Sequence, residues 1–291
     1  MTWLVSGARG QLGNAITREL DLRAIEYVAF GSDDLDITSA EKVNQIFEKI
    51  KPEVVLNAAA WTDVDGAESN SDLAFAVNGD AVANLALAIA QAGAILVHVS
   101  TDYVFSGQSD QPWAEDSRID PQSVYGHSKA AGELAIGEIY PERSYIVRTA
   151  WLYSEFGKNF AKTMCNLAIS SEKEVKVVND QIGQPTNANE LAVQLIDLVD
   201  SGASFGIYHG TNSGQASWFE FAQEIFKLSG ADAGRVTAVS SSEFPRPAKR
   251  PNYSVLGHDS WAKSGIAPMA DWKSALEKSM PAILDSIKMQ G

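Results

Sequence analysis

Short apolar runs alternate with amphipathic stretches through the first half of the chain. The runs have the length of buried strands, and the stretches between them repeat their apolar residues at helical spacing. The predicted strands are residues 2–6, 26–30, 53–57, 94–100 and 144–148, and the predicted helices are residues 14–20, 39–50, 80–92 and 124–136. Strands that alternate with helices in this way indicate right-handed βαβ units and a parallel sheet.

This pattern loosens after about residue 150. Apolar periodicity predicts helices over 159–170, 189–201, 217–228 and 272–286, and short apolar runs predict strands at 175–178 and 206–209. Residues 244–251 read FPRPAKRP, a loop rich in proline and cations. We expect a smaller lobe from this half, while strand 206–209 returns to the main sheet.

A glycine-rich segment, GARGQLG, joins the first predicted strand to the first predicted helix. Glycines at this place permit a tight turn and let backbone N–H groups approach a pyrophosphate at the helix N-terminus. A flexible turn is the alternative interpretation, but the position directly after the first strand favours dinucleotide binding. The candidate cofactor contacts in this turn are Gly7, Arg9, Gly10, Gln11, Leu12 and Gly13.

The expected fold is therefore α/β: a Rossmann-type doubly wound parallel sheet with a smaller C-terminal α/β substrate-binding lobe. Residues 1–150 are predicted to form the dinucleotide-binding domain, rejoined by about 187–212. Residues 151–186 and 213–291 are predicted to form the substrate-binding lobe. Sheets of this kind bind ligands at the carboxyl ends of their strands, so the residues just after each strand are the site candidates.

The segment after the second strand bears on the choice of coenzyme. An acidic side chain at this strand end usually binds ribose hydroxyls and favours NAD, whereas a cation favours the phosphate of NADP. Gly31 and Ser32 occupy the strand end and Asp33 follows, while Arg9 is a nearby cation. These signals conflict, so NADPH is expected and NADH stays open.

Candidate catalytic residues follow the fourth strand. Thr101 lies at its end, and Tyr125 and Lys129 lie four residues apart in VYGHSK. Such positions share one helix face, where an ammonium favours the phenolate and lowers the phenol pKa from about 10. That phenol would be a good general acid for a carbonyl oxygen, and the Thr101 hydroxyl would bind the same oxygen. A surface pair is the alternative interpretation, but the preceding glycine turn favours catalysis.

Charge and composition exclude several classes of protein. The 291 residues carry a formal net charge of −14, which opposes binding to duplex nucleic acid or to an anionic membrane. The single cysteine, Cys165, excludes an internal disulfide framework. No apolar stretch has the roughly 20 residues of a membrane span, and residues 2–6 lead directly into glycines rather than forming a signal peptide. A cytoplasmic enzyme or regulatory subunit is expected.

The segments NAAAWTDVDGAE, STDYVF, VYGHSK, RTAWLY, NFAKTM and NDQIGQPT extend this picture over nearly the full length of the chain. Together they resemble the dTDP-4-dehydrorhamnose reductases of the extended short-chain dehydrogenase/reductase superfamily. The resemblance implies NAD(P)H-dependent reduction of the C4 ketone of dTDP-6-deoxy-L-lyxo-4-hexulose to dTDP-L-rhamnose. That reaction is the last step of dTDP-rhamnose biosynthesis, which serves polysaccharide synthesis.

The resemblance also implies roles for individual residues. Thr101, Tyr125 and Lys129 match the catalytic trio, and Lys129 would also hold the nicotinamide ribose. The other implied cofactor contacts, beyond the glycine turn, are Ser32, Asp36, Ile37, Ala58, Ala59 and Ala60. The implied substrate contacts are Val64, Thr101, Asp102, Tyr103, Trp151, Arg246 and Arg250. The alternative interpretations are a capping loop for Asp36, tight packing for the alanines, a core residue for Trp151 and a solvated loop for the arginines.

One departure concerns metal and assembly. Some relatives carry a glutamate two residues past the last glycine and use it in a metal-bridged dimer, whereas this chain has Ala15. The four histidines, His98, His127, His209 and His258, show no spacing typical of metal ligands. No metal is expected, and the chain is expected to be a monomer or a weak homodimer.

Two alternatives remain open at this point. A reductase, epimerase or dehydratase for another nucleotide sugar has a similar outline, although a dehydratase normally has an acidic pair where this chain has Asp102 and Tyr103. A non-catalytic subunit similar to the methionine adenosyltransferase β subunit is the second, and the retained Thr101, Tyr125 and Lys129 argue against it. The nucleotide base and the receiving glycan also stay open.

Overall fold

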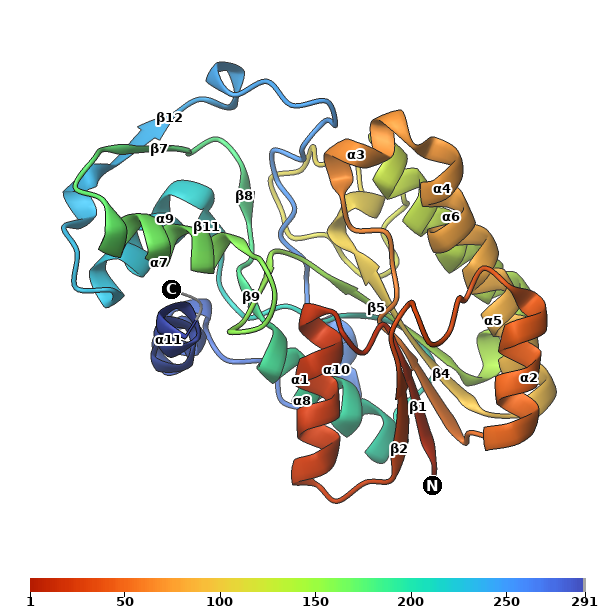
Figure 1. The fold of residues 1–291 in the computed structure, drawn as a ribbon. Coiled ribbons are helices and arrows are strands. Elements are labelled where there is room, and N and C mark those ends of the chain that lie inside the picture. Colours follow the sequence, from red (N-terminus) through yellow and green to blue (C-terminus); the bar gives the residue numbers. More distant parts are fainter. Residues whose placement is uncertain (290–291) are drawn as a thin grey trace.

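Six parallel strands form the main sheet of the computed structural model, which describes residues 1–289 (Figure 1). They are β1 (Trp3–Ser6), β2 (Tyr27–Phe30), β3 (Val54–Asn57), β4 (Ile95–Thr101), β5 (Ser144–Thr149) and β10 (Gly206–His209). Their order is β10-β5-β4-β3-β1-β2, so the chain turns outward from β1 in both directions. The predicted doubly wound sheet is confirmed, and its switch point lies between β1 and β3, where such sheets bind ligands.

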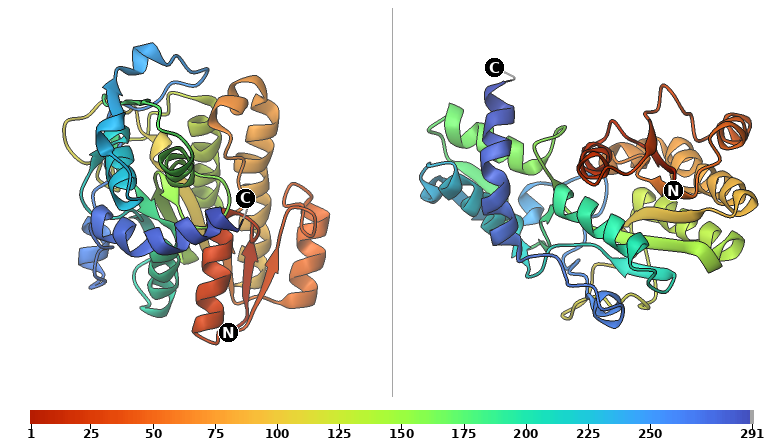
Figure 2. Two further views of the ribbon diagram at one scale, coloured as in Figure 1. Left: turned by 60° about the vertical axis from the view of Figure 1, so that its left-hand side comes forward. Right: turned by 90° about the horizontal axis from the view of Figure 1, so that it is seen from below.

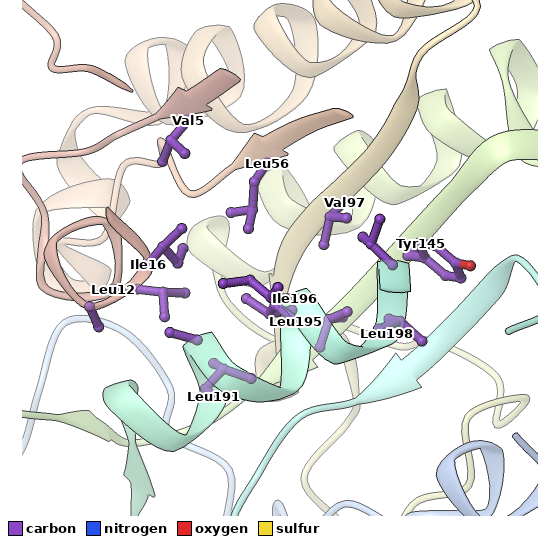
Figure 3. Close-up of a cluster of buried hydrophobic side chains, with 14 of the residues drawn as sticks. Val5, Leu12, Ile16, Leu56, Val97, Tyr145, Leu191, Leu195, Ile196 and Leu198 are labelled. Carbon is purple, nitrogen blue, oxygen red and sulfur yellow. The ribbon is translucent and has the colours of Figure 1, made fainter. Parts of the chain in front are cut away.

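Helices cover both faces of this sheet. One face carries α1 (Gln11–Leu22) and α8 (Ala188–Asp200), and the other carries α2 (Ala40–Ile50), α5 (Ala81–Ala92) and α6 (Val124–Ile139). Figure 3 shows the first face, where Leu12 and Ile16 of α1 and Leu195 of α8 lie against Leu56 and Val97 of the sheet. Burying one such side chain contributes about 1.5–3 kcal/mol, so the apolar runs fix both layers.

The start of α1 differs from the sequence prediction. It begins at Gln11, whereas residue 14 was predicted, because Gly10 occupies the N-cap and the following turn is already helical. Gly13 lowers helix propensity within that turn, and this conceals the true start. The glycine turn and the helix N-terminus are therefore directly adjacent.

A continuous helix over Ser71–Ala92 corrects one expectation about membranes. It comprises α4 (Ser71–Phe75), the π-helical turn η1 (Ala76–Asp80) and α5. It has 22 residues, and an 18-residue window within it has a mean hydropathy of 1.6. The prediction that no stretch suffices for a membrane span is therefore wrong by length and composition. Half of its apolar window is buried inside the protein, and α5 packs on α2 and α6. We assign it to the core of the domain.

The second half of the chain builds a smaller lobe beside the carboxyl ends of the strands (Figure 2). Its core consists of α7 (Phe160–Ser170), α9 (Trp218–Leu228), α11 (Trp272–Lys288) and the parallel pair β7 (Val175–Val178) and β12 (Val236–Val239). Strand β10 leaves this lobe and pairs with β5 at the sheet edge. The division of the chain into two functional domains stays a prediction.

The sequence patterns did not predict the remaining short elements. These are α3 (Val64–Ser69), η2 (Asp102–Val104), η3 (Pro141–Arg143), β6 (Leu152–Tyr153), β8 (Ile182–Gly183), β9 (Thr186–Asn187), β11 (Ala216–Ser217), η4 (Ala233–Arg235), η5 (Ser241–Glu243) and α10 (Asp259–Lys263). They are too short to show a hydrophobic period. The pairs β6–β9 and β8–β11 matter most, because they lie at the junction with the lobe.

Candidate functional site

A cavity of about 760 Å³ lies at the carboxyl ends of β1 to β5. It collects nearly every candidate residue of the sequence: Gly7, Arg9, Gly10, Gln11, Leu12, Gly13, Ser32, Asp36, Ile37, Ala58, Ala59, Ala60, Val64, Thr101, Asp102, Tyr103, Tyr125, Lys129 and Trp151. Arg246 and Arg250 do not line it. Residues from widely separated segments thus meet at the place that the sheet topology indicates.

The glycine turn fits a pyrophosphate. Gly7 has a φ of +72°, and a Cβ on Gly13 would lie 2.2 Å from the Gly7 carbonyl oxygen, so neither position accepts a side chain. No side chain caps α1 at Gly10, and its first turn contains no acidic residue. The first N–H groups of the helix therefore remain available to an anionic ligand in the cavity.

A cation from the glycine turn lies beside the end of β2, where two acidic residues follow the strand. Arg9 lies across Gly31, whose missing side chain gives it room, because a Cβ there would lie 2.7 Å from Arg9 Cδ. The guanidinium donates to Asp33 at 2.6 Å and to Asp34 at 2.8 Å, with the Arg9 side chain 62% exposed. These two carboxylates hold the guanidinium at the cavity edge, a position suited to a 2′-phosphate.

Helix α6 places Tyr125 over the end of β4. The Ser123 hydroxyl accepts from the Gly126 N–H at 3.1 Å and caps the helix one residue before it begins. A Cβ on Gly126 would lie 2.4 Å from the Tyr103 carbonyl oxygen, so glycine allows the close approach of α6 to η2. The Tyr125 and Tyr103 rings then meet in a T-shaped contact, with 5.5 Å between their centroids. Tyr125 and Thr101 face the same cavity.

The pKa of Tyr125 corrects the prediction of an acidified phenol. Burial raises this pKa well above its usual value, and the neighbouring Thr101 hydroxyl opposes the rise only in part. Lys129 is also buried, which lowers its pKa to about 8. Lys129 is therefore neutral in the range where the Tyr125 phenol ionises, and a neutral amine does not stabilise a phenolate. Its Nζ donates to the Val99 carbonyl oxygen at 2.7 Å.

Asp102 is the second titratable group at the end of β4. It is 2% exposed, and burial raises its pKa to about 6, although the hydrogen bond from the Thr101 hydroxyl at 3.0 Å opposes this. Its negative charge also disfavours ionisation of Tyr125. Asp102 therefore changes its charge close to neutral pH, beside the candidate proton donor.

Trp151 stands on the lobe side of the cavity in a strained conformation. Its φ is +46°, which a bulky side chain rarely adopts. The indole stacks on Trp218 at 3.6 Å between centroids and 11° between planes. It lies so close to Gly183 that a Cβ there would be 2.6 Å away. This arrangement holds a flat apolar surface toward the cavity.

The two arginines of residues 244–251 lie outside the cavity wall, on the side of α3. Arg250 donates to the Tyr103 hydroxyl at 3.1 Å and forms an ion pair with Asp65 at 2.9 Å. Arg246 is 3.8 Å from the same carboxylate, and its side chain is 62% exposed. Arg250 thus contacts a cavity residue, whereas Arg246 stays near the surface.

The sequence prediction missed several further residues of the cavity, among them Thr149, Lys158 and Trp218. The Thr149 hydroxyl is buried without a hydrogen-bond partner within residues 1–289, which leaves it available to a ligand. Trp218 begins α9 and has no local motif around it. Its place in the cavity wall and its stacking on Trp151 appear only in the tertiary structure.

Within residues 1–289, no group of three or more His, Cys, Asp or Glu side chains is arranged to hold a metal ion. Ala15 is buried in α1 against the sheet.

Comparison with known proteins adds to this geometry. Residues 1–284 match the family described as RmlD substrate binding domain. The chain is 46% identical over 285 residues to the dTDP-4-dehydrorhamnose reductase of Streptomyces griseus, which covers 97% of this chain and 93% of that protein.

Two solved structures share the whole fold. The dTDP-4-dehydrorhamnose reductase of Clostridium acetobutylicum superimposes with a TM-score of 0.92 at 43% identity, covering 97% of this chain and 99% of that one. The Bacillus anthracis reductase, described in complex with NADP, gives a TM-score of 0.92 at 38% identity, covering 96% and 98%.

Proposed function

This chain belongs to the family of the RmlD substrate binding domain, and on that premise we propose that it is an NADPH-dependent dTDP-4-dehydrorhamnose reductase. It reduces the C4 ketone of dTDP-6-deoxy-L-lyxo-4-hexulose to dTDP-L-rhamnose, the last step of dTDP-rhamnose biosynthesis. The observation that carries this function is the meeting of the glycine turn with Thr101 and Tyr125 in one cavity. Each half of that cavity suits one of the two reactants.

The cofactor half comprises the glycine turn and the ends of β2 and β3. The N-terminus of α1 would hold the pyrophosphate, and Arg9 would hold the 2′-phosphate beside Ser32. Ala58 and its two neighbours would leave room for the ribose and nicotinamide, and Asp36 and Ile37 would border the adenine. When bound, NADPH supplies the hydride that reduces the C4 carbon.

Tyr125 and Thr101 would act on the ketone oxygen of the substrate. Tyr125 would donate its phenolic proton to that oxygen as negative charge develops, and the Thr101 hydroxyl would donate a hydrogen bond to it. Because burial keeps Tyr125 protonated, it enters the reaction as an acid at any neutral pH. Lys129 would hold the nicotinamide ribose and, while charged, stabilise the phenolate.

Sugar and diphosphate would occupy the lobe side of the cavity. The Trp151 indole offers an apolar face to the pyranose, and Trp218 supports it from behind. Val64, Asp102 and Tyr103 close the other side. Arg250 and Arg246 would bind the diphosphate, with Arg250 exchanging its contact with Asp65 for the substrate. The lobe of residues 151–186 and 213–291 therefore serves the substrate.

The decisive test is an assay of the purified chain with the 4-keto nucleotide sugar and each reduced nicotinamide cofactor. We expect oxidation of NADPH with formation of dTDP-L-rhamnose, and slower oxidation of NADH. Absence of turnover with both cofactors, in a chain that still binds NADPH, would contradict the proposed reaction. Turnover of the isolated chain would also exclude a purely regulatory subunit.

Location and assembly complete the proposal. We propose a cytoplasmic protein that acts on a nucleotide sugar, as a monomer or weak homodimer without nucleic-acid or membrane partners. The net charge of −14 supports the absence of nucleic-acid and anionic-membrane partners, because it repels polyanions. Light scattering over a range of concentrations tests the oligomeric state.

A further inference from the structure

A line of buried polar side chains crosses the sheet behind the cavity, from β1 through β3 to β4. Ser6 donates to Asn57 Oδ1 at 2.7 Å, Asn57 Nδ2 lies 3.0 Å from His98 Nδ1, and His98 Nε2 lies 3.4 Å from Lys129 Nζ. Ser6 and Asn57 are 1% exposed, His98 is 0% exposed and Lys129 is 2% exposed. The line therefore ends on a candidate catalytic residue, and the mechanism above gives His98 no role.

Backbone hydrogen bonding decides which way the Asn57 amide points. The Ala59 N–H, which can only donate, lies 3.2 Å from Asn57 Oδ1, so the oxygen must be on that side. The amide nitrogen then faces His98 and donates to its Nδ1. An Nδ1 that accepts carries no proton.

The tautomer of His98 follows from this. Burial and the neighbouring Lys129 lower the pKa of His98 well below its usual value, so the ring is neutral. A neutral ring without a proton on Nδ1 carries it on Nε2, which is the nitrogen facing Lys129. Two N–H donors would thus oppose each other if Lys129 were an ammonium. A neutral amine instead offers a lone pair to the His98 N–H.

We propose that His98, held by Asn57 as the Nε2–H tautomer, is a positioning residue that destabilises the charged form of Lys129. Lys129 keeps one donor contact in either state, because its Nζ donates to the Val99 carbonyl oxygen at 2.7 Å. His98 thereby sets the pH above which Lys129 no longer assists the phenolate of Tyr125. This inference rests on the proposed function for its effect on rate, but its structural part stands without it.

Other charged groups around Lys129 act in known directions. Glu133 lies one turn further along α6, and its negative charge favours the ammonium form of Lys129. Arg148 forms an ion pair with the Glu133 carboxylate at 2.7 Å, which partly neutralises that charge. Tyr125 lies one turn earlier on α6, and Asp102 follows β4. The Lys129 pKa of about 8, which burial causes first of all, agrees with an ammonium that its surroundings disfavour.

The proposal is tested first on the unaltered chain, by nitrogen-15 NMR of its histidines between pH 5 and 9. We expect His98 to give the signals of a neutral ring with the proton on Nε2 throughout this range. A proton on Nδ1, or an imidazolium at pH 7, would overturn the proposal whether or not the protein is a reductase. Asn57→Asp is the second arm, because a carboxylate accepts from Nδ1–H and should reverse the tautomer.

The second test is the pH profile of kcat/KM for His98→Asn, which removes Nε2. We expect the alkaline limb of the profile to move to higher pH by about one unit, because Lys129 keeps its positive charge up to a higher pH. His209→Asn is the matched control, since His209 is equally buried but contacts Arg148 and the Gly257 carbonyl oxygen instead. A limb that stays in place in His98→Asn, or moves equally in the control, would overturn the role of His98.

Discussion

The position of Tyr125 depends on two neighbouring residues that have no chemical role in the proposed reaction. Ser123 caps the start of α6, and Gly126 lets this helix approach η2. Burial then keeps the phenol protonated, so in the proposed reaction it gives up its proton only as negative charge develops on the ketone oxygen. Single substitutions can therefore test the proposed proton donor and its titratable neighbour Asp102 separately.

Replacing Tyr125 by phenylalanine removes the proposed proton donor and leaves the ring. We expect kcat to fall by about 100-fold or more, the usual contribution of general acid catalysis, while NADPH binds with unchanged affinity. Stopped-flow turnover and quenching of tryptophan fluorescence by NADPH measure the two quantities. Turnover near that of the parent chain would exclude Tyr125 as the acid.

The raised pKa of Asp102 predicts that the free energy of unfolding depends on pH. Its folded pKa of about 6 exceeds its unfolded value near 3.9, so the folded chain binds the extra proton and loses stability as pH rises between them. Asp102→Asn should therefore raise the free energy of unfolding at pH 8 by up to about 3 kcal/mol, and much less at pH 4. Urea denaturation at both pH values checks this. An equal gain at both would contradict the buried charge.

At the scale of elements, the β1–α1 turn combines two demands that compete in the sequence. A helix disfavours glycine, yet the close approach of α1 to the turn requires it at Gly13. In the proposed function, the same turn would supply the N–H groups that bind the pyrophosphate. The glycines therefore lower the helix propensity of this turn. The sheet and α8 stabilise the helix instead, through their packing on Leu12 and Ile16.

Gly13→Ala should weaken NADPH binding by about 100-fold or more and destabilise the chain by about 1–3 kcal/mol, because its Cβ meets backbone atoms. Gly137→Ala is the matched control, since this exposed glycine of α6 has open space around its Cβ position. We expect the control to bind NADPH normally and gain up to about 1 kcal/mol. Fluorescence titration and thermal unfolding measure both. Normal NADPH binding in Gly13→Ala would contradict the pyrophosphate site.

At the scale of the whole molecule, the cavity forms between the main sheet and the smaller lobe. Trp151, Lys158 and Trp218 enter it from the second half of the chain, and the first half supplies the glycine turn and Tyr125. Residues 244–251 return to α3 through the ion pair of Arg250 with Asp65. This contact ties the two halves together beside the proposed diphosphate site.

Arg250→Ala should raise the KM for the nucleotide sugar by about 10-fold or more, because a charge-assisted hydrogen bond contributes roughly 1.5–3 kcal/mol. NADPH affinity should stay unchanged, since Arg250 lies outside the cofactor half. Arg246→Ala is the control, and we expect less than about a 3-fold change from this more exposed side chain. Steady-state kinetics separate the two. An unchanged KM in Arg250→Ala would place the diphosphate elsewhere.

The sequence by itself determined the sheet, the glycine turn and the order of the candidate catalytic residues. Each of these is a local pattern: apolar runs define strands, glycines define a turn, and a helix brings Tyr125 and Lys129 onto one face. Because parallel strands end at one edge, the residues after them had to meet. That is why nearly all the predicted side chains share one cavity.

Only the tertiary structure decided how those residues behave. Burial raises the pKa of Tyr125 and lowers that of Lys129, reversing the expectation from their spacing, because desolvation depends on every segment that covers them. Trp218 joins the site through a stack with a residue 67 positions earlier, and His98 reaches Lys129 from a different element. Spacing along a chain places a group on a helix face, but only packing sets its charge and its neighbours.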